Sequence, residues 1–195
     1  MKIGIFGGSF NPPHKVHRKI VEALKKQGYV DKVIIVPTGL HYEYKSNLVD
    51  NRYRLDMLHL LFQNLDYVSI SDYEMKEYPV YTYQTLDYFK TQYPQDDIYF
   101  ICGMDNLSYM NEWKQGSHIL TDYKILIIDR DTNNVLEILT KLSPYKNNII
   151  LTDIKPDSIS STKIRQMIKN QEQNLELYLA PEVAEYIRKE CLYES

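Results

Sequence analysis

The sequence has 195 residues, of which 44% are hydrophobic and 25% charged, and its formal net charge is −3 at pH 7. These values predict one globular domain over residues 1–195, and the weak negative charge argues against a nucleic-acid partner, which would require a basic surface. No apolar stretch approaches the length of a membrane span and no signal peptide precedes the first predicted strand, so we expect a cytoplasmic protein without membrane contact. The two cysteines lack metal-ligand spacing, so no metal site built from protein side chains is expected.

The N-terminal residues predict a strand, a glycine turn and a helix. Residues 3–6 form an apolar run typical of a buried strand, and Gly7–Gly8 permits a tight turn where a side chain would block a ligand. His14 and His17 follow on one face at the start of a helix predicted over 17–27, beside free backbone N–H groups and the positive end of the helix dipole. Anions bind at such ends, so the stretch predicts a phosphate site, although it contains neither the dinucleotide-binding nor the P-loop glycine motif.

Strand and helix patterns alternate along the chain, which predicts an α/β fold with a parallel sheet. A buried strand over 32–36 follows the first helix closely, and this spacing implies a right-handed crossover. Residues 38–51 have no periodicity and predict a loop over the site. Apolar periodicity predicts the remaining strands over 67–71, 97–102, 123–129 and 148–152, and the remaining helices over 48–64, 82–91, 134–142 and 181–191.

Two residues near the beginnings of these helices have distinct predicted roles. Arg54 is either a solvated charge or a phosphate contact, and its spacing favours the solvated charge. Thr82 is the expected N-cap of its helix, because a threonine hydroxyl can accept a hydrogen bond from a free backbone N–H group.

A second glycine turn follows the clearest central strand, at Gly103. Ligands of open α/β sheets lie beyond the carboxyl ends of the strands, so the turns at Gly7 and Gly103 should face one cleft. Asp105 either caps the following helix or accepts hydrogen bonds from a ribose. Trp113, near the end of that helix, either stacks on a planar ring in the cleft or belongs to the core.

The C-terminal part of the chain predicts a second anion site. Residues 159–165 open a helix with hydroxyl groups where its first N–H groups are free, and Lys163 and Arg165 follow on the next turn. A capping motif alone would account for the hydroxyl groups, but the Ser-Ser-Thr run together with Arg165 favours phosphate. Pro181 suits the first position of the last helix.

These motifs resemble the two signatures of the nucleotidyltransferase superfamily. Residues 8–17 correspond to GxFxPxHxGH, with Val16 where the family has glycine, and residues 159–165 match ISSTxIR completely. The segments between and after them resemble the bacterial nicotinate-nucleotide adenylyltransferase branch: Pro79–Leu86, Tyr99–Asp105, Trp113–Lys114 and Tyr178–Ile187. The resemblance implies a Rossmann-like, doubly wound parallel sheet of the nucleotidyltransferase type, with C-terminal helices.

The resemblance also implies a reaction and its site. AMP would be transferred from ATP to nicotinate mononucleotide, giving deamido-NAD and pyrophosphate, with Mg²⁺ accompanying ATP. His14 and His17 would bind the phosphates and stabilise charge on the α-phosphate. The implied ATP contacts are Gly7, Gly8, Ser9, Phe10, Gly103, Asp105, Ser161, Thr162 and Arg165. The implied contacts of the pyridine nucleotide are Thr82, Trp113, Lys114, Lys45 and Arg54.

Several alternatives stay open at this point. The resemblance implies that backbone N–H groups at Thr82 and Lys114 reach the nicotinate carboxylate. The amide substrate, nicotinamide mononucleotide, has a carboxamide there instead, and the sequence does not decide between the two. A phosphopantetheine adenylyltransferase would lack the segments around Thr82 and Trp113. A nucleotide-sensing module that has lost turnover is favoured only by Val16. The sequence also leaves open a homo-oligomer.

Overall fold

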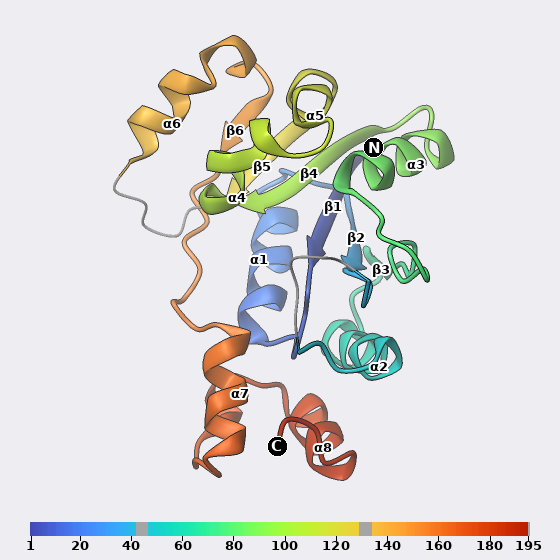
Figure 1. Ribbon diagram of the computed structural model, residues 1–195, viewed down its shortest axis with the longest axis vertical. Coiled ribbons are helices and arrows are strands. Elements are labelled where there is room, and N and C mark those ends of the chain that lie inside the picture. Colours follow the sequence, from blue (N-terminus) through green and yellow to red (C-terminus); the bar gives the residue numbers. More distant parts are fainter. Residues whose placement is uncertain (42–46, 129–133, 195) are drawn as a thin grey trace.

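The computed structural model describes residues 1–41, 47–128 and 134–194 of the chain. Over these residues it contains one six-stranded sheet in the order β3-β2-β1-β4-β5-β6, and every neighbouring pair is parallel (Figure 1). The strands are β1 (Lys2–Gly8), β2 (Lys32–Pro37), β3 (Val68–Ile70), β4 (Asp97–Gly103), β5 (Lys124–Ile128) and β6 (Ile149–Leu151). The predicted parallel, Rossmann-like sheet is confirmed.

Eight α-helices are described, together with short 3₁₀ turns at Met110–Glu112, Ser143–Tyr145 and Leu175–Leu177. The helices are α1 (Lys15–Lys26), α2 (Asn51–Phe62), α3 (Thr82–Gln92), α4 (Met104–Tyr109), α5 (Gly116–Asp122), α6 (Val135–Lys141), α7 (Ser161–Lys169) and α8 (Pro181–Lys189). Among the described residues, no helix has both the length and the apolar character that crossing a membrane would require.

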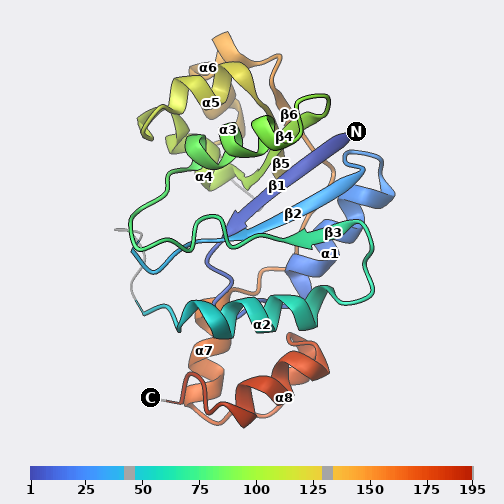
Figure 2. The ribbon, with the colours of Figure 1, turned by 90° about the vertical axis from the view of Figure 1, so that its right-hand side faces the viewer.

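Helices cover both faces of the sheet because its strands are apolar on both sides. Successive strand residues point to opposite faces, so Ile5 packs in a core with α3, α4 and α5, whereas its neighbour Phe6 packs in a core with α1 and α2. Figure 2 shows these two helical layers, with α7 and α8 extending beyond α2. Ile164 of α7 and Val183 of α8 complete the second core and are fully buried.

The centre of the sheet is the point where the chain changes face. The chain leaves β1 into α1 on one face, and it leaves the neighbouring β4 into α4 on the other. Two connections that diverge in this way leave a crevice beyond the carboxyl ends of their strands. The ends of β1 and β4 are Gly8 and Gly103, so the crevice opens where the sequence places its glycines.

The glycine turn predicted at Gly7–Gly8 is displaced along the chain. Both glycines belong to β1, where they pair with Val36 and Pro37 of β2. The chain turns only after Gly8, and Phe10 has a positive φ of 46°. The strand continues through the glycines because pairing with β2 gives their backbone N–H and C=O groups hydrogen-bond partners.

Several helices begin at residues other than the predicted ones, because different residues occupy the N-cap positions. The first helix begins at Lys15 rather than at residue 17, and Gly28, with φ of 73°, follows its end as predicted. Thr82 is the first residue of α3, not its N-cap; Tyr81 has that position, and its N–H donates to Oε1 of Gln84 at 3.0 Å. The 48–64 helix is shorter than expected, because the Asp50 side chain caps α2 through the N–H of Arg52.

The segment after β4 also differs from the prediction. The helix expected to reach Trp113 ends at Tyr109, and α5 was not predicted at all. A side chain at Gly116 would collide with the carbonyl oxygen of Met110, so the close packing of these short helices depends on a glycine. Residue 129, the expected end of the fifth strand, lies outside the described residues.

Candidate active site

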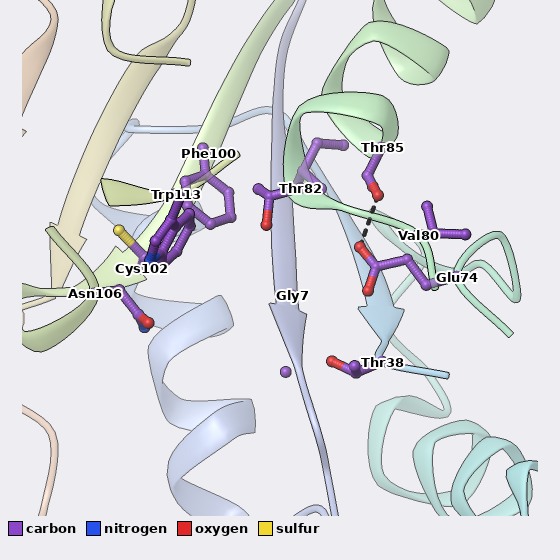
Figure 3. A pocket seen from close by; sticks show the side chains of 12 residues that line it. Gly7, Thr38, Glu74, Val80, Thr82, Thr85, Phe100, Cys102, Asn106 and Trp113 are labelled. Atoms are coloured by element: carbon purple, nitrogen blue, oxygen red, sulfur yellow. Dashed lines mark hydrogen bonds between the residues drawn. The ribbon is translucent and has the colours of Figure 1, made fainter. Parts of the chain in front are cut away.

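Two cavities meet at the carboxyl ends of β1 and β4. They share Gly7, Gly8, Cys102 and Asn106. The first extends toward α3 and is also lined by Ile5, Thr38, Glu74, Val80, Thr82, Thr85, Phe100 and Trp113 (Figure 3). The second extends toward α1 and is also lined by Phe6, Phe10, His17, Ile20, Gly103, Asp105 and Ile128. The prediction that the two glycine ends face one cleft is therefore confirmed.

The two histidines lie together at the beginning of α1. His14 is the N-cap residue, and its backbone N–H donates to Nδ1 of His17 at 3.1 Å. Their rings lie 3.8 Å apart between centroids at an angle of 31°, and the His17 ring contacts the edge of Phe10 at 4.9 Å. His14 is 2% exposed, whereas His17 lines the second cavity. The imidazoles thus form a close, tilted pair, and His17 is the one that lines the cavity.

The turn before the histidines is shaped by Phe10. A Cβ on Gly8 would lie 3.2 Å from the Phe10 ring, so a side chain at position 8 would press against this ring. Asn11 fixes the turn from the other side, since its Nδ2 donates to the carbonyl of Asn47 and its Oδ1 accepts from the hydroxyl of Tyr193 at 2.8 Å. These contacts join the turn to the C-terminal end of the described chain.

The second signature lies against this turn. Oγ of Ser161 donates to the carbonyl of Pro12 at 2.8 Å, and Nη1 of Arg165 donates to the carbonyl of Asn11 at 2.7 Å. Ser160 supplies the capping interaction by accepting from the N–H of Lys163. Capping alone therefore does not account for the Ser-Ser-Thr run at residues 160–162. Ser161 and Arg165 also bond to a segment about 150 residues earlier in the sequence.

Thr162 and Arg165 lie beside a third cavity rather than in the first two. Nη2 of Arg165 donates to Oγ1 of Thr162 at 3.2 Å, and both residues line this cavity with Lys169 and Tyr193. The structure thus places the second signature next to the first, beside a cavity that Gly103 does not line.

Arg54 is buried, so the prediction of a solvated charge is wrong. Its side chain is 0% exposed, and its guanidinium donates to the carbonyls of Ser9, Thr38 and Val49 and to the side chain of Asn51. Burial lowers the pKa of Arg54 from its usual value to about 10, and the group stays protonated at neutral pH. These contacts direct its donors toward the protein, and they fix Ser9 and Thr38 at the ends of β1 and β2.

The indole of Trp113 packs against the core and also lines the first cavity. It is half-buried, and its ring meets the edge of Phe100 at 6.3 Å between centroids. Thr82 lies across the same cavity at the beginning of α3. Nζ of Lys114 lies 4.2 Å from the centre of the Tyr81 ring, so the residues after Trp113 contact those before α3.

A second link joins α5 to α3. Nε2 of His118 on α5 bonds to Oδ1 of Asp87 on α3 at 2.8 Å, and the hydroxyl of Tyr123 donates to the same carboxylate. Hydrogen bonds to Asp87 and then Asp122 raise the pKa of His118 above its usual value. These bonds thereby hold α5 against α3, whose first residue, Thr82, lines the first cavity.

Asp105 is not the cap of the helix after β4. Gly103 has that position, and Asp105 is an exposed residue in the first turn of α4 that lines the second cavity. Its carboxylate lies so close to Gly103 that a Cβ there would collide with it. The second role considered for Asp105, as an acceptor in the cleft, is compatible with this position.

The cavity residues that were not among the predicted site residues include Asn106, Thr38 and Glu74. Asn106 lines both cavities and directly follows Asp105, a position from which it could have been suspected. Thr38 and Glu74 line the first cavity, and the sequence around them shows no periodicity that would have identified them. Glu74 accepts a hydrogen bond from Oγ1 of Thr85 at 2.7 Å, and burial raises its pKa to about 7.

Two residues of the predicted site need separate mention. Lys45 lies outside the described residues, so its prediction stays a prediction. Val16 is 3% exposed and packs in the core with Ile20, and it is not among the residues that line either cavity at the glycine ends. Its side chain therefore does not occupy the space proposed for a ligand.

Comparisons with known proteins give the family. Residues 5–167 match the family model described as cytidylyltransferase-like. The probable nicotinate-nucleotide adenylyltransferase of Acholeplasma laidlawii is 36% identical over 195 residues, covering 98% of this chain and 97% of the relative. That of Fusobacterium nucleatum is 38% identical over 174 residues, covering 88% and 90%.

A solved structure agrees at the level of the fold. The nicotinic acid mononucleotide adenylyltransferase of Plasmodium falciparum, complexed with NaAD, has a TM-score of 0.84 at 22% identity and covers 99% of this chain and 97% of that one. With the curated relatives matched over nearly their whole lengths, the chain belongs to the cytidylyltransferase-like family and, within it, to the nicotinate-nucleotide adenylyltransferases.

Proposed function

We propose that the protein transfers AMP from ATP to nicotinate mononucleotide, forming deamido-NAD and releasing pyrophosphate. The observation that carries the proposal is the pair of cavities that meet at Gly7, Gly8 and Asn106. The second cavity, with His17 and Asp105 in its wall, suits the adenosine and α-phosphate of ATP. The first, with Trp113 and the beginning of α3, suits a flat ring with an anionic substituent. The shared glycines leave room for the phosphates between them.

The proposed reaction needs positioning and charge stabilisation rather than a general base. An ionised phosphate oxygen of the mononucleotide forms a bond to the α-phosphorus, and the bond from that phosphorus to the oxygen bridging to the β-phosphate breaks. Pyrophosphate leaves with the bonding electrons. His17, with the His14 ring close beside it, stabilises the charge that develops on the α-phosphate. Ser161, Thr162 and Arg165 hold the departing phosphates at the beginning of α7.

Magnesium is proposed to arrive with ATP. Among residues 1–41, 47–128 and 134–194, no three His, Cys, Asp or Glu side chains come together as a metal site. Mg²⁺ commonly keeps several waters and binds through substrate phosphates, so this donor set fits an ion held mainly by the triphosphate. When bound there, the ion would neutralise part of the phosphate charge.

The pyridine ring is proposed to lie against Trp113. The backbone N–H group of Thr82 is one of the first in α3 and has no partner within its own helix, so it can donate to a carboxylate. The N–H group of Lys114 is the second proposed donor, held near the first by the contact of Lys114 with Tyr81. Backbone donors suit the acid, since the amide of nicotinamide would turn an N–H group toward one of them.

The test is pyrophosphate release with ATP and Mg²⁺ in the presence of nicotinate mononucleotide, nicotinamide mononucleotide or phosphopantetheine, compared by kcat/KM. We expect a strong preference for the nicotinate form. Equal kcat/KM for the acid and the amide would contradict the assigned specificity but would still support the adenylyl-transfer reaction. Binding of ATP without turnover of any of the three would contradict the proposal and favour a sensing module.

Replacing Trp113 with alanine should raise the KM for nicotinate mononucleotide about tenfold and leave the KM for ATP within about twofold. The reason is the loss of the stacking surface, which is worth roughly 1 kcal/mol beyond the area that the ring buries. Trp113→Phe should restore most of the affinity, and Tyr109→Ala, at an exposed aromatic residue of α4, is the matched control. An unchanged KM for the mononucleotide would place the indole in the core alone.

A further inference from the structure

An acidic side chain lies in the cavity proposed for an anionic ring. Figure 3 shows Glu74 across the cavity from Trp113, with its carboxyl group between Thr38 and Thr85. The other described residues that line this cavity are apolar or neutral, and none is basic. An ionised Glu74 would therefore repel the carboxylate of nicotinate without a cation in the cavity wall to offset it.

The surroundings of Glu74 favour its neutral form. One carboxyl oxygen accepts from Oγ1 of Thr85, which favours ionisation, but desolvation has the larger effect and raises the pKa to about 7. Cys102 on β4 lines the same cavity, and Tyr73 precedes Glu74 in the chain. Burial raises the pKa of Cys102 and of Tyr73, so both are uncharged at neutral pH. Asp72, Lys76 and Glu77 on the same segment are exposed and are not among the residues that line the cavity. Of the described residues that line this cavity, Glu74 is thus the one whose charge changes near pH 7.

The backbone of Glu74 is held by its neighbours, and its carboxyl group is held by Thr85. The chain at Glu74 approaches Gly39, just beyond β2, so closely that a Cβ on Gly39 would collide with the carbonyl oxygen of Glu74. Val80, in the same cavity wall, is buried, and Thr85 belongs to the first turns of α3. Glu74 is therefore fixed relative to Thr82, the proposed donor to the substrate carboxylate.

We propose that Glu74 is a specificity-determining residue whose neutral form admits the nicotinate carboxylate and whose ionised form disfavours the acid relative to the amide. This inference rests on the proposed function and adds a pH-dependent preference to it. Protonated Glu74 keeps the cavity uncharged, so the backbone donors select the acid. Loss of the proton to solvent places two carboxylates in one cavity, and the nicotinamide form, which has no carboxylate, is then penalised less.

The expected signature is a substrate ratio that falls as pH rises. Between pH 6 and pH 8, the protonated fraction of a group with pKa near 7 drops from about nine-tenths to about one-tenth, so kcat/KM for the acid divided by kcat/KM for the amide should fall about tenfold. The ratio is the proper readout, because both substrates carry the same 5′-phosphate and react at the same histidines. Titration of those shared groups changes both kcat/KM values by the same factor, so it cancels in the ratio.

The test compares the wild type with Glu74→Gln and Glu77→Gln. Glutamine at position 74 keeps an acceptor for Thr85 without a charge, so the ratio should become independent of pH and exceed the wild-type value about tenfold at pH 8. Glu77 is exposed on the same segment, and its variant should follow the wild type. A flat wild-type ratio, or a Glu74→Gln ratio that still falls with pH, would overturn the inference while leaving the proposed function intact.

A measurement on the wild type alone covers the case in which Glu74→Gln does not fold. Binding of each mononucleotide is followed by calorimetry at pH 7.5 in buffers of different ionisation enthalpy. The acid should take up a larger fraction of a proton than the amide, because its binding raises the pKa of Glu74 further. Equal proton uptake would overturn the inference. No reaction with either mononucleotide would overturn the proposed function and this inference together.

Discussion

Replacing His17 with alanine should lower kcat by about two to three orders of magnitude and change the KM values little. His17 lines the second cavity at the first turn of α1, where it faces the position proposed for the α-phosphate. An interaction made with charge that develops only in the transition state affects kcat rather than substrate binding, and removal of one such group typically costs about 10²–10³ in rate.

The structural role of His17 can be separated from this effect. Its Nδ1 accepts from the N–H of His14, as a glutamine at the same helix position does in a capping box. His17→Gln should therefore restore the thermal stability that His17→Ala loses and leave kcat low. His59→Ala, at an exposed histidine near the end of α2, is the control. A kcat near the wild-type value in His17→Gln would exclude the proposed role.

Replacing Arg54 with alanine should lower the free energy of unfolding by about 3 kcal/mol or more, because each buried acceptor left without a partner costs roughly 1–3 kcal/mol. Its guanidinium satisfies the carbonyls of Ser9 and Thr38, which belong to different strand ends, and that of Val49. Urea unfolding measures the change. Arg52→Ala, two residues earlier and exposed, should cost well under half as much.

The same substitution tests how Arg54 serves the site. The carbonyl of Ser9 precedes the turn that carries His14, so loss of this support should also lower kcat in the folded fraction. Arg54→Lys retains the charge but not the planar set of donors, and it should remain well below the wild type in stability. Full stability of Arg54→Lys, with a raised KM for a nucleotide alone, would instead indicate that Arg54 contacts phosphate.

Much of the fold and part of the site follow from local patterns. Parallel strands buried on both faces are continuous apolar runs, so β1, β2, β4 and β5 were recognisable, and the crossover rule joined them in the right way. The pair His14 and His17 and the run before Arg165 were recognisable because helix ends expose N–H groups within one turn. The boundaries near Tyr81 and Asp50 were harder, because they depend on which nearby side chain captures those groups.

The amino-acid order by itself determined the alternation of strands and helices, the glycines at the strand ends and the two phosphate motifs, because each depends on residues that are neighbours in the chain. The tertiary structure alone decided the contacts of Ser161 and Arg165 with the first turn, the burial of Arg54 and the position of Glu74 opposite Trp113. Desolvation and hydrogen-bond satisfaction depend on what folds over a residue. An arginine or a glutamate looks the same in sequence whether water or protein surrounds it.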